Sequence, residues 1–418
     1  MSGPHRFTPH PAARSAAPLL AAVVAVAAAC DRPPPTGSTS VDAEAELRRA
    51  PAPGGLGRPL LFLTIQQRRL FEQGRGVFQT VFTPERGLGP LFNANACAEC
   101  HESPVVGGVG ENEEGGEDVE IHGTRFIGPG ACDPLSDQGG PVFQRQATPA
   151  LAALGIEADP IPPGITTALR TTPDVFGFGL LDAVTDATIL ARADPDDRNG
   201  DGISGRPNRF FDGRLGRFGR KALIPTLREF NAGAFVLEQG ITNPEFLTEE
   251  TIGGDPIPPG VDPLPEPEIS QAALDATNAF LRFLAPPAAL PLAVNGRYGR
   301  ALFLQIGCAA CHVPALRTGP NPVRALSNRV VYAYTDLLLH DMGPELADIC
   351  LGEAAPSEFR TEPLMGLRFG ITFLHDGRAA TIEEAVRLHG GEAAAARGRF
   401  AALSLLQRNA LLRFLRSL

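Results

Sequence analysis

Two pentapeptides in this chain carry two thiols and an imidazole at the same fixed spacing. Residues 97–101 read Cys-Ala-Glu-Cys-His and residues 308–312 read Cys-Ala-Ala-Cys-His. The pattern C-x-x-C-H is typical of covalent c-type haem attachment, in which both thiols bond to one porphyrin edge and the histidine ligates the iron. We therefore predict two covalently attached haem c groups, one on Cys97, Cys100 and His101 and one on Cys308, Cys311 and His312.

Other uses of a C-x-x-C pair must be weighed. One such pair can be half of a zinc site or a thioredoxin-type redox pair. Neither use explains why a histidine follows the second cysteine at both sites.

The segments before the two motifs are also alike. Residues 74–78 and 299–303 both read G-R-x-x-F, and we expect each to lie on a helix. The first copy has a longer gap before its cysteines, from Gln79 to about Asn95. This similarity indicates an internal duplication of a haem-binding unit, with an inserted loop in the first copy.

Helical patterns predominate elsewhere. Thr64 and Gln67 form a predicted capping box, and helices are expected over residues 180–192 and 270–284. A terminal helix is expected over residues 404–418, with Leu406, Ala410, Phe414 and Leu418 on one side. The 46 glycines and 40 prolines predict long loops. We predict a mainly α fold with two cytochrome c-type haem domains, over residues 60–286 and 287–418.

The N-terminus has the pattern of an export signal. Arg6 and Arg14 precede a short apolar run that ends at Cys30, which resembles the lipidated first residue of a bacterial lipoprotein. An ordinary signal-peptidase site with an incidental cysteine is the alternative. We expect residues 1–30 to be a signal peptide, residues 31–59 to be a flexible linker, and the protein to be exported to the periplasm or cell envelope on a lipid anchor.

Charge and cysteine content bear on two points: whether nucleic acid is a partner, and how the remaining cysteines are used. The chain has 37 basic and 47 acidic side chains, so nucleic acid is not an expected partner. Once lipid and haem are assigned, Cys132 and Cys350 remain. In an oxidising compartment this pair suggests a disulfide, and two buried free thiols are the alternative.

One loop has the spacing of a calcium site. Residues 197–202 match D-x-N-x-D-G, which places the oxygens of Asp197, Asn199 and Asp201 at alternate positions before a glycine turn. The twelfth position is Asn208 rather than the usual glutamate. The prediction is therefore either a Ca²⁺ loop or a metal-free Asp/Asn/Gly loop.

The chain resembles a known family in several C-terminal and central runs. These runs are residues 172–177, 194–205, 339–343, 358–364, 373–378 and 381–386. They resemble bacterial di-haem cytochrome c peroxidases and, more closely, the di-haem oxidoreductases that are sometimes labelled thiol oxidoreductases. The resemblance runs from about residue 60 to the C-terminus.

The resemblance implies different roles for the two haems. The C-terminal haem would take electrons from a small donor protein of the cytochrome c or cupredoxin type, and the N-terminal haem would reduce hydrogen peroxide. His389 stands at the position of the distal methionine of the peroxidases, so the resemblance implies ligation by His312 and His389. A surface role is the alternative for His389, and Met342 is the rival ligand. His375 is expected to line the same pocket.

The N-terminal haem is less well matched. His122 is the only candidate distal histidine, in what we expect to be a loop. The acid–base glutamate of the peroxidases has no match, and their inter-haem tryptophan has no counterpart because this chain has no tryptophan. We expect an exported, peroxidase-like di-haem oxidoreductase. The alternatives are a non-catalytic envelope electron-transfer cytochrome and an oxidase of thiols or organic substrates.

Overall fold

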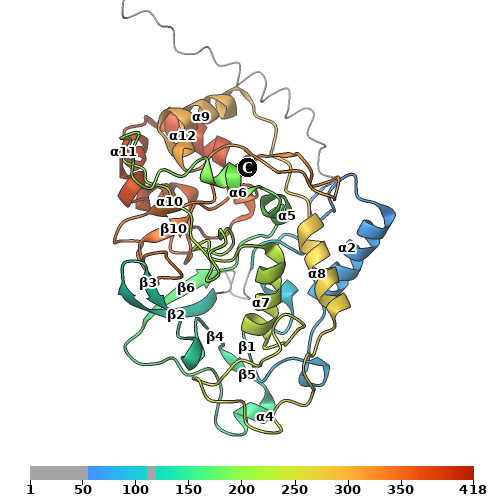
Figure 1. The fold of residues 1–418 in the computed structure, drawn as a ribbon. Helices are drawn as coiled ribbons and strands as arrows, with labels where there is room; N and C mark the ends of the chain where they lie inside the picture. The colour runs from blue at the N-terminus through green and yellow to red at the C-terminus, as the bar shows by residue number, and fades with distance from the viewer. Residues whose placement is uncertain (1–54, 111–118) are drawn as a thin grey trace, which may run out of the picture. The chain divides into compact units, whose positions relative to one another are not determined.

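Two helix pairs of the same construction hold the structure together. Helix α2 (Ile65–Phe78) packs on α8 (Gln271–Phe283), and α9 (Val294–Gln305) packs on α12 (Leu405–Leu415) (Figure 1). The computed structural model describes residues 55–110 and 119–418. The predicted signal peptide, Cys30 and all but the last residues of the predicted linker lie outside these ranges.

Each G-R-x-x-F segment supplies the close contact of its pair. A Cβ atom on Gly74 would lie 1.8 Å from the carbonyl oxygen of Ala276, and one on Gly299 would lie 2.0 Å from that of Ala410. Only glycine lets the two backbones approach so closely. One turn later the phenylalanines meet, with ring centroids 5.1 Å apart for Phe78 and Phe280. Phe303 and Phe414 repeat this contact at 5.4 Å, which supports the predicted duplication.

The helix ends follow the predicted caps. Thr64 and Gln67 form the expected capping box on α2, and Ser404 and Gln407 form another on α12. Ser270 caps α8, on which Ala276, Phe280 and Phe283 are buried. The predicted stripe on α12 is wrong at Leu406, which is 83% exposed because the first turn of that helix extends beyond the core.

The predicted helix over residues 180–192 is broken into two. Helix α5 (Phe178–Asp182) ends before α6 (Asp186–Leu190) begins, because Thr185 caps the second helix by accepting a hydrogen bond from the Thr188 amide. The shorter and remaining helices are α3 (Cys97–Cys100), α4 (Pro149–Ala152), α7 (Leu227–Gln239), α10 (Ile382–Leu388) and α11 (Ala394–Ala401). The 3₁₀ turns are η1 (Pro84–Arg86), η2 (Ser136–Gln138), η3 (Cys308–Ala310), η4 (Leu367–Phe369) and η5 (Gly391–Ala393).

The prediction of a mainly α fold is only partly right, because 31% of the described residues are helical and 15% are strand. The largest sheet is antiparallel and lies between α2 and α8 in the sequence: β2 (Val119–Gly128) pairs with β3 (Ala131–Asp133), β4 (Val142–Phe143) and β6 (Thr166–Thr171). Three two-stranded antiparallel sheets pair β1 (Leu91–Phe92) with β5 (Gln146–Ala147), β7 (Leu316–Arg317) with β8 (Val330–Val331), and β9 (Leu339–Asp341) with β10 (Glu358–Arg360).

Residues 55–110 and 119–418 belong to one compact unit. Helix α8 ends just before Ala285-Pro286-Pro287. The domain boundary that we expect there stays a prediction. Within the described ranges, no helix combines the length and the apolar character needed to cross a membrane.

A disulfide joins the two halves of the chain. Cys132 on β3 is bonded to Cys350, with their Cα atoms 5.8 Å apart and a sequence separation of 218 positions. The predicted pairing of these two cysteines is confirmed. Thr124 on β2 adds a buried hydrogen bond from its hydroxyl to the Cys350 carbonyl, at 3.1 Å.

We expect Cys350→Ser to lower the free energy of unfolding by about 3 kcal/mol, because the cross-link restricts a very long loop of the unfolded chain. Denaturant unfolding of the haem-loaded protein measures the change. Cys132→Ser is the matched control: it removes the same bond, so the double variant should be no less stable than either single one. An additive double variant, or no loss at all, would contradict a stabilising disulfide.

Candidate functional site

The second C-x-x-C-H motif follows directly on α9. Cys308 begins η3, and His312 lies just beyond it. The Nδ1 atom of His312 lies 3.0 Å from the carbonyl oxygen of Tyr334. Since a carbonyl only accepts, Nδ1 carries the proton, and Nε2 is left as a free electron-pair donor. This is the tautomer that an iron ligand requires.

His389 faces His312 in a matching state. It follows the last turn of α10, and its Nδ1 atom donates to the carbonyl of Ala385 at 2.7 Å. The two imidazole centroids are 6.5 Å apart. This separation is too large for stacking. It suits two Nε2 atoms that bind the same metal ion from opposite sides, each at roughly 2 Å. The structure thus brings together the two histidines that the resemblance implies as ligands.

A cavity of about 330 Å³ includes both histidines together with Cys308 and Cys311. Phe303, Ile382 and Val386 supply apolar lining. Burial and the facing His389 lower the pKa of His312 to about 4, and burial also lowers the pKa of His389. Both imidazoles are therefore neutral at pH 7, which is the form that binds iron. The donor set and the apolar walls fit a haem with two histidine ligands.

The two methionines that follow the second motif, Met342 and Met365, lie in different surroundings. Met342 lines the same cavity, so it stays the rival ligand. Met365 is buried instead in the core beside Phe176 and Leu284.

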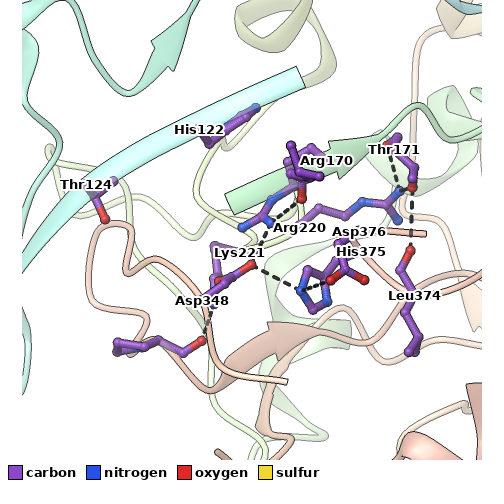
Figure 2. A network of polar contacts seen from close by, with 12 residues as sticks. His122, Thr124, Arg170, Thr171, Arg220, Lys221, Asp348, Leu374, His375 and Asp376 are labelled. Carbon is purple, nitrogen blue, oxygen red and sulfur yellow. Dashed lines mark hydrogen bonds and ion pairs between the residues drawn. The ribbon is translucent and has the colours of Figure 1, made fainter. Parts of the chain in front are cut away.

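His375 also lines the cavity, but its side chain belongs to a buried charged network (Figure 2). Its ring stacks on Phe359 at 4.2 Å, and its Nε2 atom lies 3.2 Å from Asp348. Asp348 also pairs with Arg170 at 2.6 Å and with Lys221 at 3.1 Å. Burial lowers the pKa of His375 to about 4, so it is a neutral member of this network. The network ties β6 to the chain segment that carries Cys350.

The first C-x-x-C-H motif has similar proximal geometry. Helix α3 begins at Cys97 and ends at Cys100. The Nδ1 atom of His101 donates to the carbonyl of Gly108 at 3.3 Å. The ring of Phe78, from the G-R-x-x-F segment, lies 5.9 Å from that of His101. His101 thus resembles His312 in its Nδ1 contact with a backbone carbonyl, and it has a further backbone hydrogen bond with Pro173.

A cavity with many polar side chains lies beside Cys100, although neither Cys97 nor His101 lines it. A cavity of about 220 Å³ is lined by Cys100 together with Asn93, Glu99, Glu120, Arg145, Gln146 and Thr172. The predicted loop position of His122 is wrong: it lies on strand β2, paired with Ala168 of β6. Its Nε2 atom is bonded to Glu120 at 2.9 Å, and it lines neither cavity. The structure therefore does not bring His122 to the first haem site as a ligand.

Glu120 is a functional candidate that the sequence did not reveal. Burial raises its pKa, but the hydrogen bond from His122 and the charges of His122, His101 and Arg220 outweigh burial and leave the pKa below its usual value. Glu120 and His122 are two residues apart and so share one face of β2. The two-residue spacing of Glu120 and His122 was visible in the sequence. It places them on one face only because the segment pairs as a strand.

A second carboxylic acid lies behind the same cavity. Burial, and then the charge of Glu120, raise the pKa of Glu238 well above its usual value. Its Oε2 atom accepts a hydrogen bond at 2.8 Å from Asn93, which lines the cavity. Two carboxyl groups with pKa values pushed apart are typical of acid–base pairs in active sites.

The two cavities share one lining residue. Thr172 lines both, and the adjacent Thr171 accepts a hydrogen bond at 3.0 Å from Arg220 on its carbonyl oxygen (Figure 2). The segment around residue 172 is thus part of both sites. This chain has no tryptophan that could lie between them.

The other uses of the cysteines fit poorly. Burial raises the pKa of Cys97 and of Cys308 to about 12, whereas a redox-active C-x-x-C pair needs a lowered thiol pKa. Among residues 55–110 and 119–418, one group of three His, Cys, Asp or Glu residues has its ligand atoms within 4.8 Å of one another, and it is Glu249, Asp262 and Glu268. Neither C-x-x-C-H motif therefore forms a zinc-type cluster.

The predicted calcium loop folds onto its own backbone. The carboxylate of Asp197 accepts from the amides of Asp201 and Gly202, and Asn199 accepts from that of Asp201. Asn208, at the twelfth position, points inward and donates to the carbonyl of Lys221 at 2.7 Å. Calcium binding by Asp197, Asn199 and Asp201 stays a prediction.

Comparison with known proteins gives one family and several distant structures. The family model described as "Di-haem oxidoreductase, putative peroxidase" matches residues 163–418. A search of curated proteins found no match. Among solved structures, the diheme peroxidase BthA from Burkholderia thailandensis is 16% identical, with 84% of this chain and 86% of that chain covered and a TM-score of 0.39.

Two further structures are similarly distant. A MauG-like protein associated with microbial copper homeostasis is 16% identical, covering 88% of this chain and 94% of that chain with a TM-score of 0.39. Kuenenia stuttgartiensis hydrazine synthase is 14% identical, covering 88% and 95% with a TM-score of 0.38.

We expect His389→Ala to convert the second haem from a low-spin to a high-spin spectrum, because it removes the imidazole that faces His312. Visible absorption and EPR spectroscopy of the ferric protein measure the change. Met342→Leu is the matched control from the same cavity and should leave the spectrum low-spin. If the two variants behaved in the opposite way, Met342 would be the ligand.

Proposed function

Because this chain belongs to the di-haem oxidoreductase family, we propose that it is an exported, c-type di-haem enzyme that reduces peroxide. Electrons would enter at the haem on Cys308 and Cys311 and be used at the haem on Cys97 and Cys100. The observation that carries this division is the contrast between the sites. His312 has a facing imidazole, whereas the cavity beside Cys100 is lined by Glu120 and other polar side chains.

The residues of the first site suit proton transfer to peroxide. When bound, haem supplies the iron and the electrons for cleavage of the O–O bond. Glu120, ionised through its bond to His122, can accept a proton from the bound peroxide. Glu238, protonated by its burial, can return a proton through the Asn93 side of the cavity.

The second site suits reception of electrons from a donor protein. Two facing histidines leave no open iron position, so the haem there would transfer electrons without binding substrate. Arg397 and Arg399 are exposed and line the same cavity, so a small donor with an acidic surface is favoured. A lipid anchor at Cys30 would hold the enzyme at the cell envelope, where such donors are found.

The alternative is a carrier without catalysis. In that case both haems would be six-coordinate and inert to peroxide. EPR of the purified ferric protein distinguishes the two functions: we expect one high-spin signal, from the first haem, that disappears when hydrogen peroxide is added. Two low-spin signals that peroxide leaves unchanged would overturn the proposed enzyme.

We expect Glu120→Gln to lower the rate of peroxide reduction by roughly 10²- to 10⁴-fold, the usual contribution of a general base. In the wild type, activity should fall as pH drops through the lowered pKa of Glu120, because the base becomes protonated. This acid limb should be absent from the residual activity of the variant. Glu157→Gln, at an exposed position, is the control; a Glu120 variant with its rate and acid limb intact would exclude Glu120 as the base.

A further inference from the structure

His340 is a buried imidazole held between two carboxylates. It is 3% exposed. Its Nε2 atom lies 2.9 Å from Oδ2 of Asp336, and its Nδ1 atom lies 2.8 Å from Oε2 of Glu392. Ionised carboxylates only accept hydrogen bonds, and a neutral imidazole has one N–H. Both contacts can be made together only if His340 carries two protons and a positive charge.

The charges on this residue agree with the geometry. Burial lowers the pKa of His340, but the hydrogen bonds with Asp336 and Glu392 act in the opposite direction and favour its charged form. Burial raises the pKa of Glu392, and the hydrogen bonds from His340 and Ser204 more than offset it. The group Asp336–His340–Glu392 therefore carries two negative charges and one positive charge.

The network holds Glu392 rigidly. Oε2 of Glu392 accepts from the amide of Ser204 at 3.0 Å, and Oε1 accepts from the Ser204 hydroxyl at 2.7 Å. Oε1 also accepts from the amide of Asp341 at 3.3 Å. Gly205 abuts the imidazole, since a Cβ atom there would lie 2.7 Å from Cε1 of His340. These contacts fix both the ring and its carboxylate partner.

This charged group lies at the second haem site. The Nδ1 atom of His340 is 3.6 Å from Sγ of Cys311, one of the two attachment cysteines. His340 and Glu392 line the same cavity as His312 and His389. A haem gains one negative charge on reduction, and a charge in a buried site acts on it with little screening.

We propose that His340 is a positioning residue that sets the reduction potential of the second haem, by offsetting the charges of Asp336 and Glu392 beside Cys311. The proposal rests on the second haem of the proposed function and concerns its electrons rather than the reaction with peroxide. Nothing in the peroxide chemistry of the first site uses this group.

The test is a spectroelectrochemical titration of the haem-loaded protein at pH 8, with the second haem followed by its α-band. His340→Gln leaves two unbalanced negative charges and should lower the midpoint potential. Glu392→Gln removes one negative charge and should raise it. The double variant has the same net charge as the wild type, so its potential should return toward the wild-type value.

Opposite shifts with recovery in the double variant support a charge effect. A purely structural role would shift both single variants in one direction and the double variant furthest, which overturns the proposal. Glu353→Gln, whose carboxylate is 50% exposed, is the control for loss of a remote charge, and shifts no larger than its own also overturn it. A haem count of one, or inertness to peroxide, would instead refute the proposed function and is measured separately.

Discussion

Close contact between helix backbones at two glycines is the constraint on which the structure depends. At Gly74 and at Gly299 a side chain would collide with a carbonyl oxygen of the partner helix. The contact places Phe78 beside the ring of His101 in the first unit, and α9 leads directly into Cys308 in the second. The residues of both C-x-x-C-H motifs are therefore positioned by the same helix crossing that builds each core.

What distinguishes the two units is the chain between their paired helices. In the first unit, this chain forms the four-stranded sheet that carries Glu120 and His122, and it supplies Glu238 from α7. In the second, it supplies His389 and the group around His340. The Cys132–Cys350 disulfide and the Arg170–Asp348 ion pair connect the two. The chemistry of each site thus comes from inserted segments, on frames that are alike.

The sequence predicted the parts of this arrangement that depend on local spacing. The C-x-x-C-H motifs, the G-R-x-x-F helices and the capping boxes are short-range patterns, and the remaining cysteines could be paired because only two were left. His122 was misplaced because its strand is defined by partners such as Ala168, 46 positions away in the sequence numbering. Glu120 and the partners of His340 were missed for a related reason. Each has one partner close in sequence, His122 or Asp336, but its full environment also needs residues from other elements, such as Glu392.

The spacing of the first helix pair has a consequence for how such a protein can change. Helices α2 and α8 enclose residues 79–270, whereas α9 and α12 enclose residues 306–404. The first connection is roughly twice as long, yet each doubling of a loop costs only about 0.6 kcal/mol in closure entropy. A helix pair clamped at one glycine can therefore accept long insertions at small thermodynamic cost. New reactivity can be acquired by exchanging the inserted segment while the clamp stays the same.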